Sequence, residues 1–369
     1  MHDIPYCPNP ECSTNHSEGE TEPKFRKKGF GKNHQSEKIQ RYQCKICGHA
    51  FNINTFHIDY YTHRKISYKR LVDSLISSSG IRDMARQFKC SSKTILNRID
   101  RLANKAAALT AQIINNIDLN ENLSADGFES FILSQFFPTN INILVGQKSQ
   151  FVYYFNAFYF HRKGRMTEEQ KAKAKELYQR AQFEKNAPSK YFKMLLDKVA
   201  DLMGRSSKKE LILDTDENMI YHYQFLKHDR MSNVKHRKTN STEKRDFQNK
   251  LFPCNYMDRE FRKDMSEHTR ETVQFGRNMN NSMNRFSVYT FWHNFRKPYR
   301  INKSGKYRKI KYKTHAEAAG VPRELVEEIA NRLFDGSRIL YFKVENQLDS
   351  FQKDLWKKEL MNPLKTAAV

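Results

Sequence analysis

The chain has 369 residues, of which 38% are hydrophobic, and its 65 lysines and arginines outnumber its 41 aspartates and glutamates, so the formal net charge is +24. This length predicts two to four structural units, and 26 Phe and 18 Tyr supply enough apolar surface for real cores. A positive surplus of this size favours a polyanionic partner, because the charges repel one another until a partner neutralises them. A basic protein with no role in nucleic-acid binding is the alternative.

No segment of the sequence predicts a membrane span or a secretion signal. The chain contains no run of 18 apolar residues, and its first residues lack an apolar signal core. We therefore expect a cytoplasmic protein, in which thiols stay reduced. The six cysteines then need an explanation other than disulfide bonds.

Four cysteines form two close pairs in the first part of the chain. They are Cys7, Cys12, Cys44 and Cys47. Two such turns can direct four thiolates at one tetrahedral zinc ion, which joins two otherwise weak hairpins. We predict a zinc ribbon with a structural Zn²⁺ and a long loop between the pairs, and four unliganded cysteines are the alternative. Cys90 and Cys254 are isolated and are expected to be small buried side chains.

The following segment has the pattern of a helix-turn-helix DNA-binding domain. Apolar residues recur at helical spacing over 81–88, a turn follows at 89–91, and a second helix begins near Ser92. The polar side chains of this second helix are expected to face outward and to contact base edges and phosphates in a major groove. They are Lys93, Thr94, Asn97, Arg98 and Arg101. A helical hairpin with a solvated basic face is the alternative.

A mixed α/β region follows the helical segment. Residues 123–160 are rich in aromatic and branched side chains and predict strands. Two helices, the first opening with a capping box, and a short strand are expected next, over 167–183, 189–203 and 210–213. A basic loop, a long helix, a basic run and two helical pieces complete the prediction, over 227–250, 257–296, 302–313, 315–334 and 348–360.

Acidic residues end two of the predicted strands. Asp126 follows a short apolar run, and the run 211–213 leads directly into Asp214 and Asp216. If the two strands are neighbours, these acids lie side by side at one edge of the sheet. Two carboxylates with a third from a helix can hold two Mg²⁺ ions, which activate the attacking oxygen and stabilise the leaving oxygen. A single strand-end aspartate is more often a loop cap.

The third acid is expected on the long helix. Four candidates rise along one face at helical spacing, so periodicity does not choose among them, and much of this face could be plain solvated surface. They are Glu260, Asp264, Glu267 and Glu271.

Several motifs resemble those of insertion-sequence transposases that combine a zinc ribbon, a helix-turn-helix and a ribonuclease-H-like core. The motifs are DGFESF (126–131), FHRKGRMT (160–167), LDTDE (213–217) and HTRETVQFGRNMNN (268–281). The resemblance covers about 120–301 and extends to the front end of the chain. It implies an Asp-Asp-Glu triad of Asp126, Asp216 and Glu271 that binds Mg²⁺ or Mn²⁺.

The resemblance also implies the organisation and the function. The fold expected is multidomain α+β. Its parts are a zinc ribbon (1–60), a helix-turn-helix domain (61–115), a ribonuclease-H-like α/β core (120–301) with a helical insertion at about 167–205, and a basic linker with a helical tail (302–369). The implied function is a transposase that cleaves and joins DNA strands and acts as a homo-oligomer on double-stranded DNA. A zinc-dependent transcriptional regulator without catalysis, or a ribonuclease-H-like nuclease or resolvase, is the alternative.

Overall fold

The computed structural model describes residues 6–15, 25–32, 38–240, 242–301 and 312–364. Within these residues the chain is mixed α+β, as predicted, with a three-stranded sheet, a five-stranded sheet and eleven α-helices. The basic run predicted over 302–313 lies almost entirely outside the described residues. None of the described helices combines the length and the apolar character that crossing a bilayer requires.

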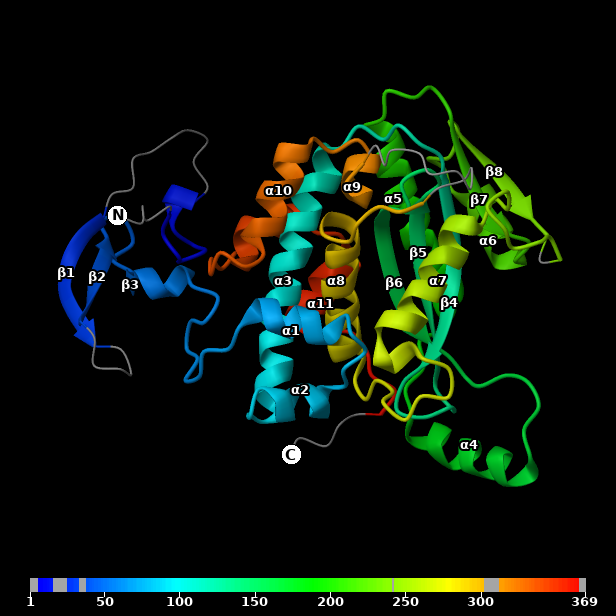
Figure 1. Cartoon of the computed structure of the whole chain (residues 1–369), viewed down its shortest axis with the longest axis horizontal. Helices are drawn as coiled ribbons and strands as arrows, with labels where there is room; N and C mark the ends of the chain where they lie inside the picture. Colours follow the sequence, from blue (N-terminus) through cyan, green and yellow to red (C-terminus); the bar gives the residue numbers. More distant parts are fainter. Residues whose placement is uncertain (1–5, 16–24, 33–37, 241, 302–311, 365–369) are drawn as a thin grey trace.

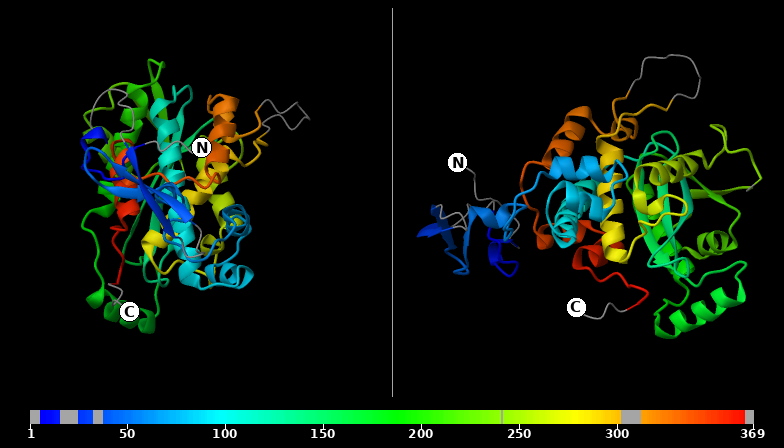
Figure 2. Two further views of the ribbon diagram at one scale, coloured as in Figure 1. Left: turned by 90° about the vertical axis from the view of Figure 1, so that its left-hand side faces the viewer. Right: turned by 60° about the horizontal axis from the view of Figure 1, so that its bottom comes forward.

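The three-stranded sheet forms a small module at one end of the molecule (Figure 1 and Figure 2). Its strands pair antiparallel in chain order and are β1 (Phe25–Lys32), β2 (Lys38–Cys44) and β3 (Ala50–Asn52). The module is attached to the C-terminal part of the chain. Ile58 N donates a hydrogen bond to Gly336 O (2.8 Å), and Arg338 N donates one to Phe56 O (2.7 Å). The C-terminal segment therefore helps to hold this module on the rest of the protein.

The five-stranded sheet has the order β6-β5-β4-β7-β8. Its strands are β4 (Leu123–Phe131), β5 (Pro138–Gly146), β6 (Val152–Tyr159), β7 (Leu211–Asp216) and β8 (Val234–Thr239). The first three pair antiparallel, whereas β7 runs parallel to β4 and β8 parallel to β7. The strands predicted over 123–160 and 210–213 are confirmed. The loop predicted over 227–250 is wrong at β8, a basic edge strand whose sequence, VKHRKT, has too little apolar character to be recognised.

Helices cover both faces of the large sheet (Figure 1). One face packs against α5 (Ala187–Gly204), which also contacts α6 (Met219–Lys227). The opposite face packs against α7 (Phe252–Asp264) and α8 (Met279–Phe295). The predicted helix over 167–183 is α4 (Glu168–Arg180), and Thr167 and Gln170 form its capping box.

The single long helix predicted over 257–296 is wrong, because the chain breaks it between α7 and α8. A short 3-10 turn and an irregular segment separate the two helices. The break buries Glu267 and His268, and Glu267 forms an ion pair with Arg285 of α8. Asn278 then caps α8 by accepting a hydrogen bond from Asn281 N (3.0 Å). The helical spacing of apolar residues continues across the break, and for this reason a single helix was predicted. Asn278, a typical N-cap residue, was the local signal for a new helix start.

The segment predicted as a helix-turn-helix contains three helices, α1 (Tyr68–Leu75), α2 (Ile81–Gln87) and α3 (Ser92–Asn116). The third helix is long and packs along α8. Buried residues of these helices, among them Leu71, Ile99 and Leu109, belong to the same core as the large sheet. The helices therefore form a layer on the α/β region.

The C-terminal segment wraps the far side of this layer. Its helices are α9 (His315–Ala318), α10 (Arg323–Arg332) and α11 (Ser350–Lys357), which fall within the predicted helical pieces. The buried Lys105 of α3 forms an ion pair with Asp335 (2.5 Å), and the side chain of Asn280 exchanges hydrogen bonds with the backbone of Leu360. The segment is thus part of the packed structure.

Candidate functional site

The four paired cysteines converge on one point. The sulfur atoms of Cys7, Cys12, Cys44 and Cys47 all lie within 4.8 Å of one another. The Sγ–Sγ distances are 3.6 Å for Cys7 and Cys47 and 3.8 Å for Cys12 and Cys44. The first pair of cysteines therefore meets the second across the module, and the arrangement is one that can hold a metal ion.

Local hydrogen bonds shape both turns that carry these cysteines. In the first turn, the side chain of Asn15 donates to the carbonyls of Cys7 (3.0 Å) and Asn9 (2.8 Å). In the second, Gly48 has a φ of +73° and donates its N–H to Cys44 O (3.0 Å). Glycine adopts this left-handed backbone conformation readily, because it has no Cβ that would clash with the backbone. The two close cysteine pairs in the sequence were therefore enough to predict this cluster.

A second candidate site lies on the large sheet, where strand register brings two acids together. Ser124 of β4 pairs with Asp214 of β7 in a parallel ladder. Two residues further along, Asp126 and Asp216 therefore occupy neighbouring strands and the same face, because side chains alternate with a period of two. The predicted side-by-side arrangement of these two acids agrees with this register.

Electrostatics show that the charge of Asp216 acts on Asp126. Burial and the nearby charge of Asp216 raise the pKa of Asp126 to about 7, against the one hydrogen bond that Gly127 N donates to its Oδ1 (2.7 Å). Burial likewise raises the pKa of Asp216, which accepts a hydrogen bond from Asn218 N (3.0 Å). A glycine follows Asp126 for a steric reason, because a Cβ at Gly127 would stand 2.3 Å from Nδ2 of Asn140.

Asp258 of α7 is the third acid at this place. Burial, and next the charge of Asp126, raise its pKa to about 7. Its Oδ1 is buried and has no hydrogen-bond partner among the described residues. Helix α7 packs against β4 and β5, and Phe261, one turn further on, contacts Phe128 of β4 with ring centroids 5.4 Å apart. That packing places Asp258 over the sheet near Asp126.

Other groups surround the three aspartates. Burial, followed by the charge of Asp126, raises the pKa of Cys254, and also that of Tyr221. The charge of Arg245 acts in the opposite direction and lowers the pKa of both Asp126 and Asp258. The site is therefore a buried group of acids with two arginines nearby, since Arg262 also lowers the pKa of Asp258. Uncompensated carboxylates in such a place are a common mark of function.

Asp214 has a different role from Asp216, although the two lie on the same face of β7. It is 0% exposed, and Arg237 of β8 donates to both of its oxygens (2.5 and 3.0 Å). Gln147 donates a further hydrogen bond to it. Its hydrogen-bonding capacity is thus used in joining β7 to β8. The structure separates the two aspartates, which the residue pattern alone left open.

Glu271 lies away from helical structure. It is an exposed residue of the turn after Ser266–His268, with a φ of +55°. None of the charges that shift the pKa of Asp126, Asp216 or Asp258 comes from it. The structure therefore brings Asp126 and Asp216 together and places Asp258, not Glu271, beside them.

The other acids of the predicted stripe form ion pairs. Glu260 pairs with Lys297 and Lys263, and Asp264 with Lys297 (3.2 Å).

The sequence analysis did not select Asp258, although the sequence contained a signal for it. It stands four residues after Cys254 and three before Phe261, both 0% exposed, so that it is an acid on the buried face of an amphipathic helix.

The three aspartates are more open than the cysteine cluster. Among the described residues, the cysteines are the only group of three or more ligating side chains whose atoms all lie within 4.8 Å of one another. The charge of Asp216 acts on Asp126, and that of Asp126 on Asp258, but the three carboxylates do not meet within that distance.

The predicted DNA-contact residues of α3 differ in exposure. Lys93 and Asn97 are exposed, and Thr94 is half-buried, with its Oγ1 3.0 Å from Oγ of Ser91. The prediction that Arg98 faces outward is wrong. It is 4% exposed, and its guanidinium donates to Arg64 O (2.7 Å).

Arg101 is half-buried and donates to Ile58 O (2.6 Å). Both arginines therefore anchor the chain that leads from the cysteine module into α1, where backbone carbonyls would otherwise lack donors.

The chain was compared with models of protein families and with curated proteins, and none of them matches it.

Proposed function

We propose that the protein is a metal-dependent DNA transposase of the insertion-sequence type, with Asp126, Asp216 and Asp258 as its catalytic carboxylates. The observation that carries the proposal is the meeting of these three acids. They come from two adjacent strands and a covering helix, and each has a pKa that burial raises. A mixed sheet with acids on neighbouring inner strands supports the ribonuclease-H-like core that the sequence resemblance implies.

The residues present fit divalent metal ions. Carboxylate oxygens are the ligands that Mg²⁺ and Mn²⁺ prefer. The buried Oδ1 of Asp258 has no partner among the described residues, and Asp126 has a proton affinity raised by its neighbours. A bound cation would give the Oδ1 of Asp258 a partner and would stabilise the ionised form of Asp126. When bound by these three aspartates, Mg²⁺ would supply charge neutralisation at a phosphodiester and an acidified water.

The protein's own residues would position the DNA strand. Arg245 stands beside Asp126 and Asp258 and would hold the phosphate against the acidic site. The ring of Phe128 packs under the guanidinium of Arg262, with CZ 4.7 Å from the ring centroid, which keeps a second cation at the rim of α7. Phosphoryl transfer of this kind depends on positioning and charge compensation.

The remaining modules would bind DNA rather than cleave it. The cysteine cluster supports a structural Zn²⁺, because four thiolates complete a tetrahedral shell and leave no open position. Lys93 and Asn97 at the exposed start of α3 support contact with a phosphate or a base edge. The net charge of +24 supports a polyanionic partner. We propose double-stranded DNA as that partner, with the protein acting as a homo-oligomer on it.

Cleavage and strand transfer on DNA test this function. The substrate is a duplex carrying the sequences that flank the protein's own gene, incubated with purified protein and Mg²⁺. We expect nicked ends and products joined to a target plasmid. Asp258→Asn should lower cleavage by roughly a hundredfold or more, the scale of losing one group that stabilises transition-state charge, whereas Glu271→Gln should retain it.

The outcomes separate the alternatives. Cuts without joined products would favour a nuclease or resolvase. DNA binding without any cuts, unchanged by Asp258→Asn, would favour a transcriptional regulator and overturn the catalytic proposal.

A further inference from the structure

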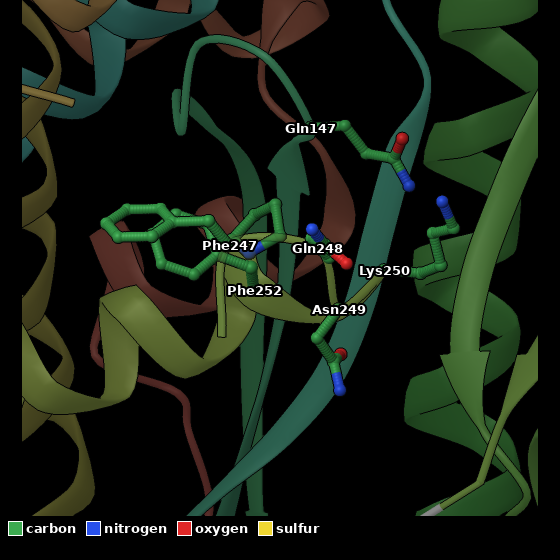
Figure 3. Close-up of a pocket in the computed structure, with 7 residues that line it drawn as sticks. Gln147, Phe247, Gln248, Asn249, Lys250 and Phe252 are labelled. Carbon is green, nitrogen blue, oxygen red and sulfur yellow. The ribbon is translucent and has the colours of Figure 1, made fainter. Parts of the chain in front are cut away.

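A pocket of about 380 Å³ lies at the start of α7 (Figure 3). This volume is within the range of small-molecule pockets, roughly 300–1,000 Å³. Six of the residues that line it are Gln147, Phe247, Gln248, Asn249, Lys250 and Phe252. The combination of aromatic rings, amides and an ammonium group is unusual for a purely structural hollow and points to a particular ligand chemistry.

Two phenylalanines provide apolar surface in this pocket, with their rings tilted by 40° to each other. The ring centroids of Phe247 and Phe252 are 4.7 Å apart, and Figure 3 shows the rings side by side. Phe252 packs partly against the core, whereas Phe247 is 48% exposed. An aromatic ring that is exposed and supported by a second ring is a platform on which a nucleobase can stack.

Polar groups of the same pocket are available to a ligand. The side chain of Gln248 and the ammonium of Lys250 form no hydrogen bond or ion pair within the described residues. The side chain of Asn249, in contrast, forms hydrogen bonds within the loop: it donates to Lys244 O (3.0 Å) and accepts from Leu251 N (2.8 Å). The loop is therefore held in shape. The amide of Gln248 is open to a base edge, and the ammonium of the exposed Lys250, whose charge also acts on Asp214, can reach a phosphate.

The same loop connects the pocket to the three aspartates. Arg245, two residues before Phe247, acts electrostatically on Asp126 and Asp258. On the other side, Gln147 donates a hydrogen bond to Asp214, which precedes Asp216 on β7. A nucleic acid strand with a phosphate at Arg245 would thus have its neighbouring nucleotide next to the pocket.

We propose that this pocket binds an unpaired nucleobase of the DNA strand that lies at the acidic site. The base stacks on Phe247, Gln248 hydrogen-bonds its edge, and Lys250 contacts the adjacent phosphate. The inference rests on the proposed function and deepens it, because it assigns a single-stranded or extruded nucleotide as the feature recognised beside the cleavage position. Stacking on an aromatic ring offsets the cost of extruding a base from the duplex.

Binding of a labelled oligodeoxynucleotide tests the proposal in buffer without added Mg²⁺. The full-length protein is titrated against the oligonucleotide as a single strand and as a duplex, with fluorescence anisotropy as the readout. We expect Phe247→Ala to weaken single-strand binding by roughly tenfold, as loss of one stacked base predicts, and duplex binding by less than about twofold. Phe247→Tyr keeps the ring and should bind the single strand as the wild type does.

Two results would overturn the proposal. One is unchanged single-strand affinity in Phe247→Ala. The other is an equal loss for single strand and duplex, which would indicate a general backbone contact. Tyr223→Ala serves as the matched control, because Tyr223 is another exposed aromatic residue (54%) that does not line the pocket, and its loss should leave single-strand binding intact. If Asp258→Asn fails to affect cleavage, the proposed function fails, while the binding result for Phe247 still stands by itself.

Discussion

The cysteine cluster and the aspartate cluster are assembled in opposite ways. The cysteines lie on two short turns whose shape is fixed by neighbouring hydrogen bonds, and their sulfur atoms already converge within 4.8 Å. The aspartates come from β4, β7 and α7, and each meets the others only through strand register and helix packing. A cluster built from local turns can be predicted whole from spacing, whereas one built across a sheet and a covering helix was predicted only in part.

The largest expected effect concerns the cysteine cluster. Cys44→Ser should abolish metal binding by the module and unfold it, since structural zinc contributes on the order of 10 kcal/mol to domains of this kind. Zinc content measured on the purified protein, together with limited proteolysis of the module, checks this expectation. Cys90→Ser is the matched control, because Cys90 is a half-buried cysteine outside the cluster. A wild-type protein that contains no zinc would contradict the proposal that the cysteine cluster is a structural zinc site.

The second prediction separates the structural aspartate from the site aspartate on β7. Asp214→Asn should lower the free energy of unfolding by about 1–3 kcal/mol, because Arg237 and Gln147 would lose a charged acceptor in a buried place. Asp216→Asn should cost far less stability and abolish cleavage instead. Chemical denaturation of both variants measures the difference. Equal destabilisation by the two substitutions would remove the distinction between them.

The third prediction concerns pH and follows from the raised pKa of Asp126, about 7. Between its ordinary pKa near 4 and pH 7 the folded protein holds a proton that the unfolded chain has released, so metal-free stability falls as the pH rises through this window. Asp126→Asn removes this contribution and should raise the melting temperature at pH 8 by roughly 2–5 °C.

Thermal melts at pH 5 and pH 8 test this expectation, with Glu271→Gln as the control that should behave as the wild type does. A variant Asp126→Asn that melts lower than the wild type at pH 8 would show that the carboxylate is not strained in the metal-free protein.

The smallest effect is expected at the start of α3. Lys93→Ala should weaken DNA binding a few-fold and reduce its salt dependence by about one released ion, without changing stability. Arg98→Ala should do the reverse, because Arg98 is buried and bonded to Arg64 O. Salt-dependent binding curves and denaturation curves for both variants provide the readout. If Arg98→Ala changed only DNA affinity, the placement of that side chain would be incorrect.

Much of the fold followed from local patterns in the sequence. The strands over 123–160, the capping box at Thr167 and the cysteine pairs were all predictable because neighbouring residues determine them. Strand β8 and the break before α8 were not, since β8 depends on pairing with β7 and the break depends on the burial of Glu267 against Arg285.

The same distinction applies to the acids. Asp126 and Asp216 end apolar strands and could be selected, with the resemblance to transposases choosing between Asp214 and Asp216. The third acid could not be selected, because the predicted helix ran through the region where the chain turns. The resemblance thus implied Glu271, whereas the structure brings Asp258 near Asp126 through the packing of α7 on β4.

The central claim is that Asp258, and not Glu271, completes a divalent-metal site with Asp126 and Asp216. Binding of Mn²⁺ to the protein purified with zinc tests this claim most directly. Electron paramagnetic resonance of free Mn²⁺ measures the affinity for the wild type, Asp258→Asn and Glu271→Gln. The account predicts that Asp258→Asn weakens binding by at least about tenfold, whereas Glu271→Gln binds as the wild type does, since only the former removes a ligand. Loss of binding in Glu271→Gln with full binding in Asp258→Asn would contradict it.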